Sequence, residues 1–327
     1  MKSPFTGKEM KLVVEKRTQQ FRKEDFEIYF HCYQCEDTGE QFETQEQSEL
    51  NYNQVINLFR AKYQIPSTEE IIQIRKKYGV SAKMMSQILG FGVNMYSKYE
   101  SGEVPSVSNG TSIRMAQNPS ALESLLGRCL DLDEDKKAGI LKRIQKLKDI
   151  RKDEWLSRIS TEIPTLNNGF RAFNLEKFQN MIKYFAERLS PFKVKMNKLL
   201  FYADFECFRR FGVGMSGVEY QAIKMGPVPH YYQSQFDLAQ RNGMIEIDEI
   251  LYSNGMVGEK FESVGDKFNT DLFSKNELDV LEHILDLFKD TSTHEIIDIS
   301  HKETAWIECE KERNLIPYSY AFELINS

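Results

Sequence analysis

Residues 67–102 carry helix-boundary signals close together, which restricts this stretch to short helices joined by tight turns. Ser67 and Glu70 fit a capping box, in which a hydroxyl and a carboxylate each satisfy a backbone amide at a helix start. Gly79 is placed to end that helix, and Ser81 is placed to cap the next one. The segment therefore predicts a compact cluster of short helices.

Two further helices are expected here, over 82–89 and 93–100, with the turn 90–92 between them. The helical period gives the second of these a core side of three residues: Val93, Tyr96 and Tyr99. It leaves four residues on the outward side: Asn94, Met95, Ser97 and Lys98. The pair of helices has the spacing of a helix-turn-helix.

A helix-turn-helix can place its second helix in the major groove of DNA. Asn94 can pair with adenine, and Lys98 can donate to guanine or to a phosphate. Segment 66–130 holds seven Lys and Arg against five Asp and Glu, a mild positive surplus in a chain of net charge −6. We predict DNA contacts from five residues: Lys83, Asn94, Met95, Ser97 and Lys98. The alternative is a three-helix packing module that does not bind DNA.

Residues 90–102 read GFGVNMYSKYESG, which resembles the Xre-type helix-turn-helix of the MqsA (YgiT) antitoxin family, with its pattern G-x-G-V-N-x-x-S-[RK]-Y-E-x-G. The resemblance implies that Asn94 and Lys98 are the base-reading pair and that the partner is operator DNA. The family's usual Arg is Lys98 here, and Lys lacks the rigid fork of Arg.

Antitoxins of this family begin with a small zinc module that holds two Cys-x-x-Cys pairs. This chain keeps one pair, Cys32 and Cys35, and has Ser3 and Thr6 where the other pair would lie. A structural zinc needs four sulfur or nitrogen ligands, so we expect no metal and no cofactor, with Cys32 and Cys35 as weak metal candidates. The expected core of this β-rich module consists of six residues: Phe5, Val13, Phe26, Ile28, Phe30 and Phe42. A zinc-bound module is the alternative.

Residues 169–327 carry a second set of motifs, which includes KxxKLLFYAD at 195–204, GPVP at 226–229 and SHKETAW at 300–306. These motifs resemble the Panacea domain, also called the SocA-like antitoxin domain. The resemblance implies binding of a cognate protein toxin, either to sequester it or to deliver it to a protease. Eight residues belong to these motifs: Lys195, Lys198, Asp204, Gly226, Pro227, Pro229, His301 and Trp306.

Elementary chemistry gives these motif residues mostly structural roles. Lys195 and Lys198 lie three apart on one helix and are expected to pair with Asp204 or Glu206, or to cover a surface. Residues 225–229 are expected to be a loop, because each proline restricts its own backbone and the residue before it. The five histidines are scattered without metal spacing, and the GxGxxG at 212–217 lacks a preceding strand. We therefore expect no catalysis.

The expected fold is mainly α with small β. It divides into a finger-like module at 1–50, the helix-turn-helix domain at 51–130, an amphipathic helical linker at 131–168 and a mostly helical α+β domain at 169–327. No apolar run approaches the roughly 20 residues of a membrane span. The polar start and five sparse cysteines indicate a cytoplasmic protein without membrane association.

The sequence thus predicts a type II antitoxin that binds a cognate toxin through 169–327, represses its own operon and forms a homodimer, the usual state of helix-turn-helix proteins on palindromic sites. The acidic C-terminal segment, with 18 Lys and Arg against 25 Asp and Glu over 166–327, suits a basic toxin. A transcriptional regulator without a toxin and a proteolytic adaptor are the alternatives.

Overall fold

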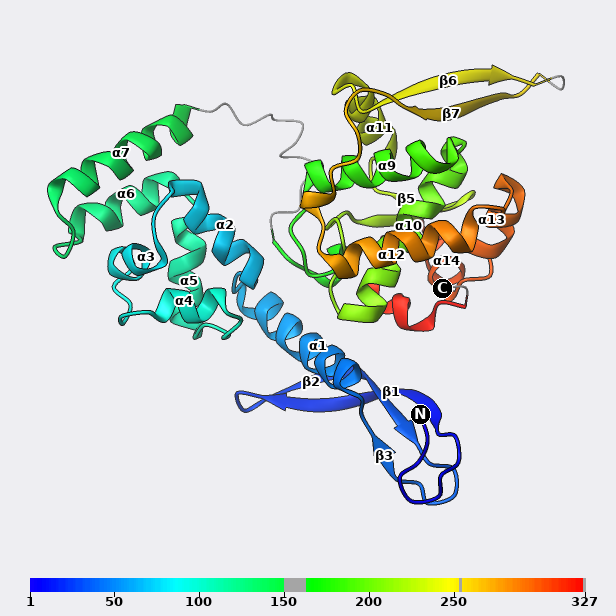
Figure 1. Ribbon diagram of the computed structural model, residues 1–327, viewed down its shortest axis with the longest axis horizontal. Helices are drawn as coiled ribbons and strands as arrows, with labels where there is room; N and C mark the ends of the chain where they lie inside the picture. The colour runs from blue at the N-terminus through cyan, green and yellow to red at the C-terminus, as the bar shows by residue number, and fades with distance from the viewer. Residues whose placement is uncertain (150–162, 253–254, 326–327) are drawn as a thin grey trace. The chain divides into compact units, whose positions relative to one another are not determined.

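A computed structural model describes residues 1–149, 163–252 and 255–325 (Figure 1). The fold is mainly α with three small sheets in the described residues, which confirms the expected class. The chain divides into two compact units. Unit 1 comprises 1–20, 27–55 and 158–327, and unit 2 comprises 21–26 and 56–157.

The N-terminal module is a sheet of order β1-β2-β3, with strands Lys11–Phe21, Glu24–Gln34 and Gln41–Phe42. Phe26, Ile28 and Phe30 are buried on one face of β2, as their alternation predicts. Arg22 and Lys23 form the turn between β1 and β2 at positive φ, without a glycine to mark it in the sequence. Phe5, expected in the core, is 65% exposed, so that assignment was wrong.

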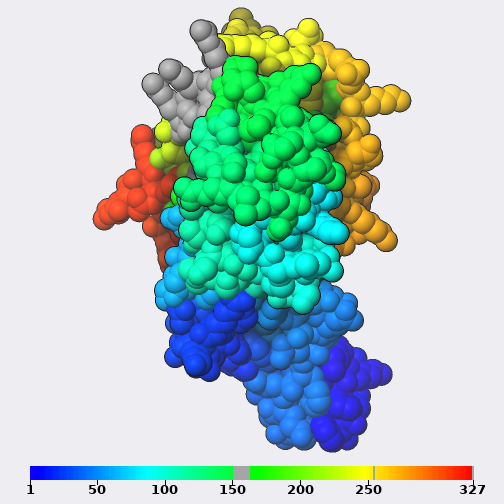
Figure 2. Space-filling view, turned by 90° about the vertical axis from the view of Figure 1, so that its left-hand side faces the viewer, coloured from blue at the N-terminus to red at the C-terminus, as the bar shows by residue number. Residues whose placement is uncertain are grey.

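Helix α1, Gln45–Tyr63, leads from this module to the helices of unit 2. Those helices lie at Thr68–Tyr78 (α2), Ala82–Ile88 (α3), Met95–Glu100 (α4), Val107–Ala116 (α5), Pro119–Arg128 (α6) and Glu134–Asp149 (α7). They form a continuous surface, coloured cyan to green in Figure 2. The capping box of Ser67 and Glu70 is present, and Gly79 ends α2 in the left-handed conformation, as predicted.

The start of α4 differs from the expectation. Asn94 takes a left-handed conformation, with φ of 68°, so the helix begins at Met95 rather than at Val93. Val93 therefore does not join the core and is 77% exposed. Tyr96 and Tyr99 are buried, as the helical period predicts.

Helix α7 closes the core of unit 2. Ile140 and Ile144 are buried in the same apolar cluster as Ile71, Met85 and Tyr96. Arg143 donates to the carbonyls of Tyr78 and Gly79 at 3.1 and 2.7 Å. The helix that the sequence predicts as a connector thus packs on α2 and caps its end.

The C-terminal part of unit 1 is built around α10, Lys193–Phe211, which packs against helices, a short hairpin and the last turn of the chain (Figure 1). Its helical elements are η1 (Leu166–Asn168), α9 (Leu175–Leu189), α11 (Tyr232–Arg241), η2 (Thr270–Leu272), α12 (Lys275–Phe288), α13 (Thr293–Ser300), α14 (Thr304–Cys309) and η3 (Tyr318–Glu323). An apolar stripe on α9 is fully buried: Phe178, Met181, Ile182 and Phe185.

Two antiparallel hairpins complete this part. Strand β4, Tyr220–Ile223, pairs with β5, Gly226–Pro229, so the predicted loop at 225–229 was wrong from residue 226 on. Pro227 and Pro229 alternate, so both missing donors lie on the edge of β5 that faces away from β4. Strands β6, Ile245–Leu251, and β7, Val257–Ser263, pair antiparallel, and residues 253–254 between them lie outside the described residues.

Across the described ranges, every helix is too short or too polar to cross a lipid bilayer.

Candidate functional sites

The predicted DNA-reading residues lie at and after the N-terminus of α4. Asn94, Ser97 and Lys98 are exposed, and Lys83 is exposed on α3. Met95 is half-buried and packs against the core of unit 2, so its side chain is less available than the sequence suggests. The structure therefore presents an amide, a hydroxyl and two amines outward from the paired helices.

Buried polar contacts fix the position of α4. The backbone amide of Tyr96 donates to Ser86 Oγ at 3.0 Å, and Tyr96 Oη donates to the Ile71 carbonyl at 2.8 Å. Arg75 on α2 pairs with Glu100 at 2.6 Å, with both side chains largely buried. These contacts tie both ends of α4 to α2 and α3, which holds the outward residues on a rigid support.

Ser3 and Thr6, which the resemblance places where a second Cys pair would lie, form a hydrogen-bonded turn beside Cys35 that is here called the knuckle. Ser3 is buried, and its Oγ accepts from the amides of Phe5 and Thr6, each at 3.3 Å. Thr6 Oγ1 lies 3.6 Å from Cys35 Sγ. Hydrogen bonds to the sulfur from Ser3, Thr38 and Thr6 lower the pKa of Cys35 to about 6.

The pKa of Cys32 is shifted in the opposite direction to that of Cys35. Burial raises the pKa of the Cys32 thiol above its ordinary value. In the part of the chain that the structure describes, no group of three or more His, Cys, Asp or Glu side chains could hold a metal ion. Hydroxyls thus stand where two of four sulfur ligands would be needed.

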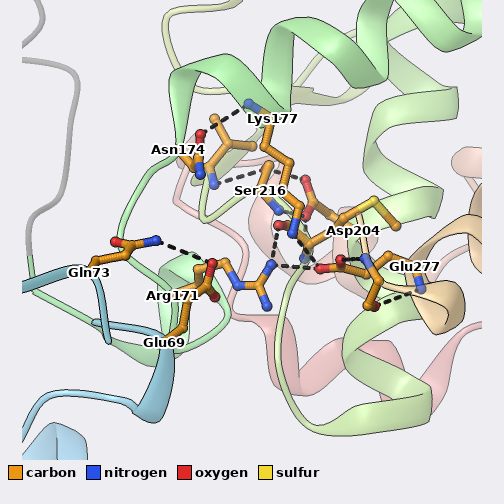
Figure 3. Close-up of polar contacts among 11 residues, drawn as sticks. Glu69, Gln73, Arg171, Asn174, Lys177, Asp204, Ser216 and Glu277 are labelled. Carbon is orange, nitrogen blue, oxygen red and sulfur yellow. Dashed lines mark hydrogen bonds and ion pairs between the residues drawn. The ribbon is translucent and has the colours of Figure 1, made fainter. Parts of the chain in front are cut away.

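Asp204 is the centre of a buried hydrogen-bond network in the C-terminal domain (Figure 3). Its Oδ1 accepts from the amides of Met215 and Ser216 at 2.8 and 2.7 Å. Its Oδ2 accepts from Ser216 Oγ at 2.6 Å and from Tyr220 Oη at 2.9 Å. Burial raises the pKa of Asp204, and these donors oppose that rise. The side chain therefore anchors the loop before β4.

The expected pairing of Lys195 and Lys198 with Asp204 or Glu206 was wrong. Lys195 Nζ donates to the Thr291 carbonyl at 2.5 Å, near the C-terminal end of α12. Glu206 pairs instead with Arg209 and Arg210, at 2.6 and 2.5 Å. Both lysines donate to backbone carbonyls of segments that are distant in the sequence. The spacing of the two lysines along their helix does not predict these partners.

Lys198 is fully buried, and its Nζ donates to the Pro227 carbonyl at 2.8 Å. The described residues place no carboxylate in ion-pair contact with this amine. Burial lowers the pKa of Lys198 to about 7, because desolvation penalises the ammonium form. Lys198 thus links α10 to β5 through a buried hydrogen bond to Pro227, and this contact is here called the clamp.

Gly226, at the start of β5, makes room for that clamp. Its φ is +96°, and a Cβ there would lie 2.6 Å from both Lys198 Cε and Ser300 Oγ. His301 stacks on Trp306, with ring centroids 3.9 Å apart. Trp306 Nε1 donates to the Ile223 carbonyl at 2.8 Å, so the motif residues join α10, α13, α14 and the β4–β5 hairpin.

A buried ion cluster that the sequence pattern does not predict holds the start of α9 to the start of α12 (Figure 3). Glu277 pairs with Arg171 at 2.7 Å and with Lys177 at 2.6 Å. Arg171 also donates to the Met215 carbonyl at 2.7 Å, which links the cluster to the Asp204 loop. The capping box of Ser274 and Glu277 was a visible local signal, but the two cations come from about a hundred residues earlier.

Two comparisons with family models bear on these sites. Residues 1–117 match the antitoxin component of bacterial toxin-antitoxin systems, MqsA. Residues 196–307 match the antitoxin SocA-like, Panacea domain. The chain combines an MqsA-like segment with a SocA-like Panacea domain. A comparison with curated proteins finds no match.

Both matched models describe antitoxins, so two separate parts of the chain support an antitoxin role. The MqsA-like match contains the N-terminal knuckle and helices α1 to α5. The Panacea match begins inside α10 and ends inside α14, and it contains most of the buried clamp.

Proposed function

We propose that the chain is a type II antitoxin that neutralises a cognate toxin by direct binding through residues 169–327 and represses its own operon through the helix-turn-helix. The observation that carries the proposal is that two non-overlapping segments match two antitoxin families. The proposed division is 1–50, 51–130, 131–168 and 169–327, as the sequence suggests. Neutralisation then proceeds by masking the toxin, without bond-making chemistry.

The DNA-binding part of the proposal is supported by the exposure of Asn94 and Lys98 on a helix that buried contacts hold in place. Each good base contact discriminates by about 1–3 kcal/mol, which corresponds to roughly 5- to 150-fold in affinity. A homodimer on a palindromic operator would use each contact twice.

Gel retardation with the DNA upstream of the chain's own gene tests this part. The double variant Asn94→Ala, Lys98→Ala should lose retardation, whereas the matched pair Lys275→Ala, Asn276→Ala, also exposed, should retain it. Retardation by the Asn94, Lys98 variant at wild-type concentrations would show that the module packs without reading DNA.

Co-expression with the gene adjacent to the chain's own gene tests the toxin-binding part. Expression of the neighbour alone should arrest growth, and co-expression of the full chain should restore it. Restored growth with a shortened half-life of the neighbour's product would identify a proteolytic adaptor. Normal growth when the adjacent gene is expressed alone would indicate that the chain is a transcriptional regulator without a toxin.

A further inference from the structure

Helix α7 carries a basic stretch that lies outside both matched family models. The helix follows the MqsA-like match, which ends at residue 117, and precedes the Panacea match, which begins at residue 196. It holds six Lys and Arg against three Asp and Glu, and the three carboxylates lie in its first and last turns. The stretch 136–148 therefore contains cations and no carboxylate.

The cations of α7 divide between two neighbouring helices. Lys148 pairs with Glu123 of α6. Arg143 lies on the other side, where its Nη1 donates to the two carbonyls that end α2, at 3.1 and 2.7 Å. Lys146 follows Arg143 by three residues, and residues three apart on a helix are neighbours, so Lys146 shares the α2 side with Arg143.

Backbone contacts hold the guanidinium of Arg143 against the end of α2. Gly79 has a φ of +60°, and a Cβ there would lie 2.3 Å from Arg143 Nη1, so this close approach requires a residue without a side chain. Both hydrogen bonds use Nη1, and Nε and Nη2 have no partner among the described residues. Arg143 is exposed, so a group that is fixed in place still presents unused donors to an anion.

Two exposed lysines flank the same turn between α2 and α3. Lys76 lies in the last turn of α2, and its carbonyl accepts from the Gly79 amide at 2.9 Å. Lys83 is the second residue of α3. In the part of the chain that the structure describes, Lys76, Lys83 and Lys146 form no ion pair. These three lysines and Arg143, here called the Gly79 patch, gather four cations around one turn.

From this arrangement we propose that the Gly79 patch binds the phosphate backbone of operator DNA, beside the helix that reads the bases. Lys83 belongs to the helix-turn-helix, so the patch continues the surface that presents Asn94 and Lys98. Phosphates complement a cluster of unpaired Lys and Arg, and such contacts fix a protein on the duplex without reading its sequence. This inference rests on the proposed repression of the operon and adds α7 to the DNA-binding surface.

The test measures the affinity of the full chain for the DNA upstream of its own gene by fluorescence anisotropy at several salt concentrations. Lys146→Gln should lower the slope of log affinity against log salt by about 0.9 for each chain bound, the contribution of one phosphate contact. Lys76→Gln, Lys146→Gln should lower that slope by about 1.8 for each chain bound. The matched control Lys148→Gln removes the same charge from the α6 side of the same helix and should leave the slope unchanged.

An unrelated duplex of equal length separates backbone contacts from base contacts. The patch variants should lose affinity for both duplexes by a similar factor, because phosphate contacts carry no sequence information. Thermal unfolding by circular dichroism should show that all three variants fold.

Three outcomes would contradict the proposal. Unchanged slopes in both patch variants, while the wild-type chain binds its upstream DNA, would overturn the patch and leave repression through the helix-turn-helix standing. Loss of affinity for the upstream DNA alone would assign the two lysines to base reading and also overturn the patch. Failure of the wild-type chain to bind either duplex would remove both proposals.

Discussion

Replacement of Lys198 by methionine should change how the stability of the C-terminal domain depends on pH. The amine is fully buried, with a pKa of about 7 in the folded chain and an ordinary value of 10.5. Between these values the unfolded chain binds a proton at Lys198 that the folded chain does not bind. Folding is therefore penalised below the folded pKa, and this penalty disappears as the pH rises toward the unfolded pKa.

The size of the effect follows from the shift. Within that pH window, each pH unit changes the free energy of unfolding by about 1.36 kcal/mol for a single titrating group. From about pH 7.5 to about pH 9, the wild-type chain should gain about 2 kcal/mol relative to Lys198→Met. At the upper pH the variant should be less stable by about 1–3 kcal/mol, because the Pro227 carbonyl loses its buried donor.

Tryptophan fluorescence can report this domain alone. The chain has two tryptophans, Trp155 and Trp306, and a Trp155→Phe background leaves Trp306, which bonds to the β4–β5 hairpin. Urea unfolding at each pH then gives the two free energies of unfolding. Lys289→Met is the matched control, because its pairing with Asp286 raises the pKa of Lys289 and keeps it charged throughout. Parallel pH profiles for wild type and Lys198→Met would refute the reasoning.

Two further predictions concern the knuckle at Ser3 and Thr6 and the clamp between Lys198 and Pro227. The variant Ser3→Cys, Thr6→Cys should bind one zinc ion per chain by metal analysis, because it supplies four sulfurs, whereas Ser3→Ala, Thr6→Ala should bind none; equal zinc in both would contradict the placement of these residues. Gly226→Ala should destabilise the chain by about 2–4 kcal/mol in urea unfolding, since it combines a positive φ with a clash on Lys198. Gly255→Ala, which shares the positive φ but has open space, should cost clearly less; equal losses would show that crowding at Gly226 is unimportant.

Local signals allowed much of the helical fold to be predicted. Ser67, Glu70 and Gly79 act on backbone groups only a few residues away, so their geometry is encoded in the nearby sequence. The exposure of Val93 was missed because Asn94 adopts a left-handed conformation, which is uncommon for residues other than glycine although asparagine takes it more often than most. Helical periodicity predicts which residues are buried only where the backbone is helical, and the backbone at Asn94 is not.

The candidate sites were harder to predict, because their partners are distant in sequence. Lys198 donates to the carbonyl of Pro227. Pro227 belongs to a strand that was predicted as a loop because of its prolines. Asp204 accepts hydrogen bonds from a loop and a strand rather than pairing with a lysine of its own helix. Residue types and helix faces were sufficient to identify buried positions such as Tyr96, and insufficient to identify which polar groups form hydrogen bonds with one another.

The packing of α7 affects how such a protein can be divided. The MqsA-like match ends at residue 117, yet the core that supports α4 also includes Leu122 and Leu126 from α6 and Ile140 and Ile144 from α7. A fragment cut at 117 or 130 would expose that core and remove the cap that Arg143 places on α2. Exchange of the C-terminal segment between related chains would therefore preserve the fold of unit 2 when the crossover falls beyond Asp149.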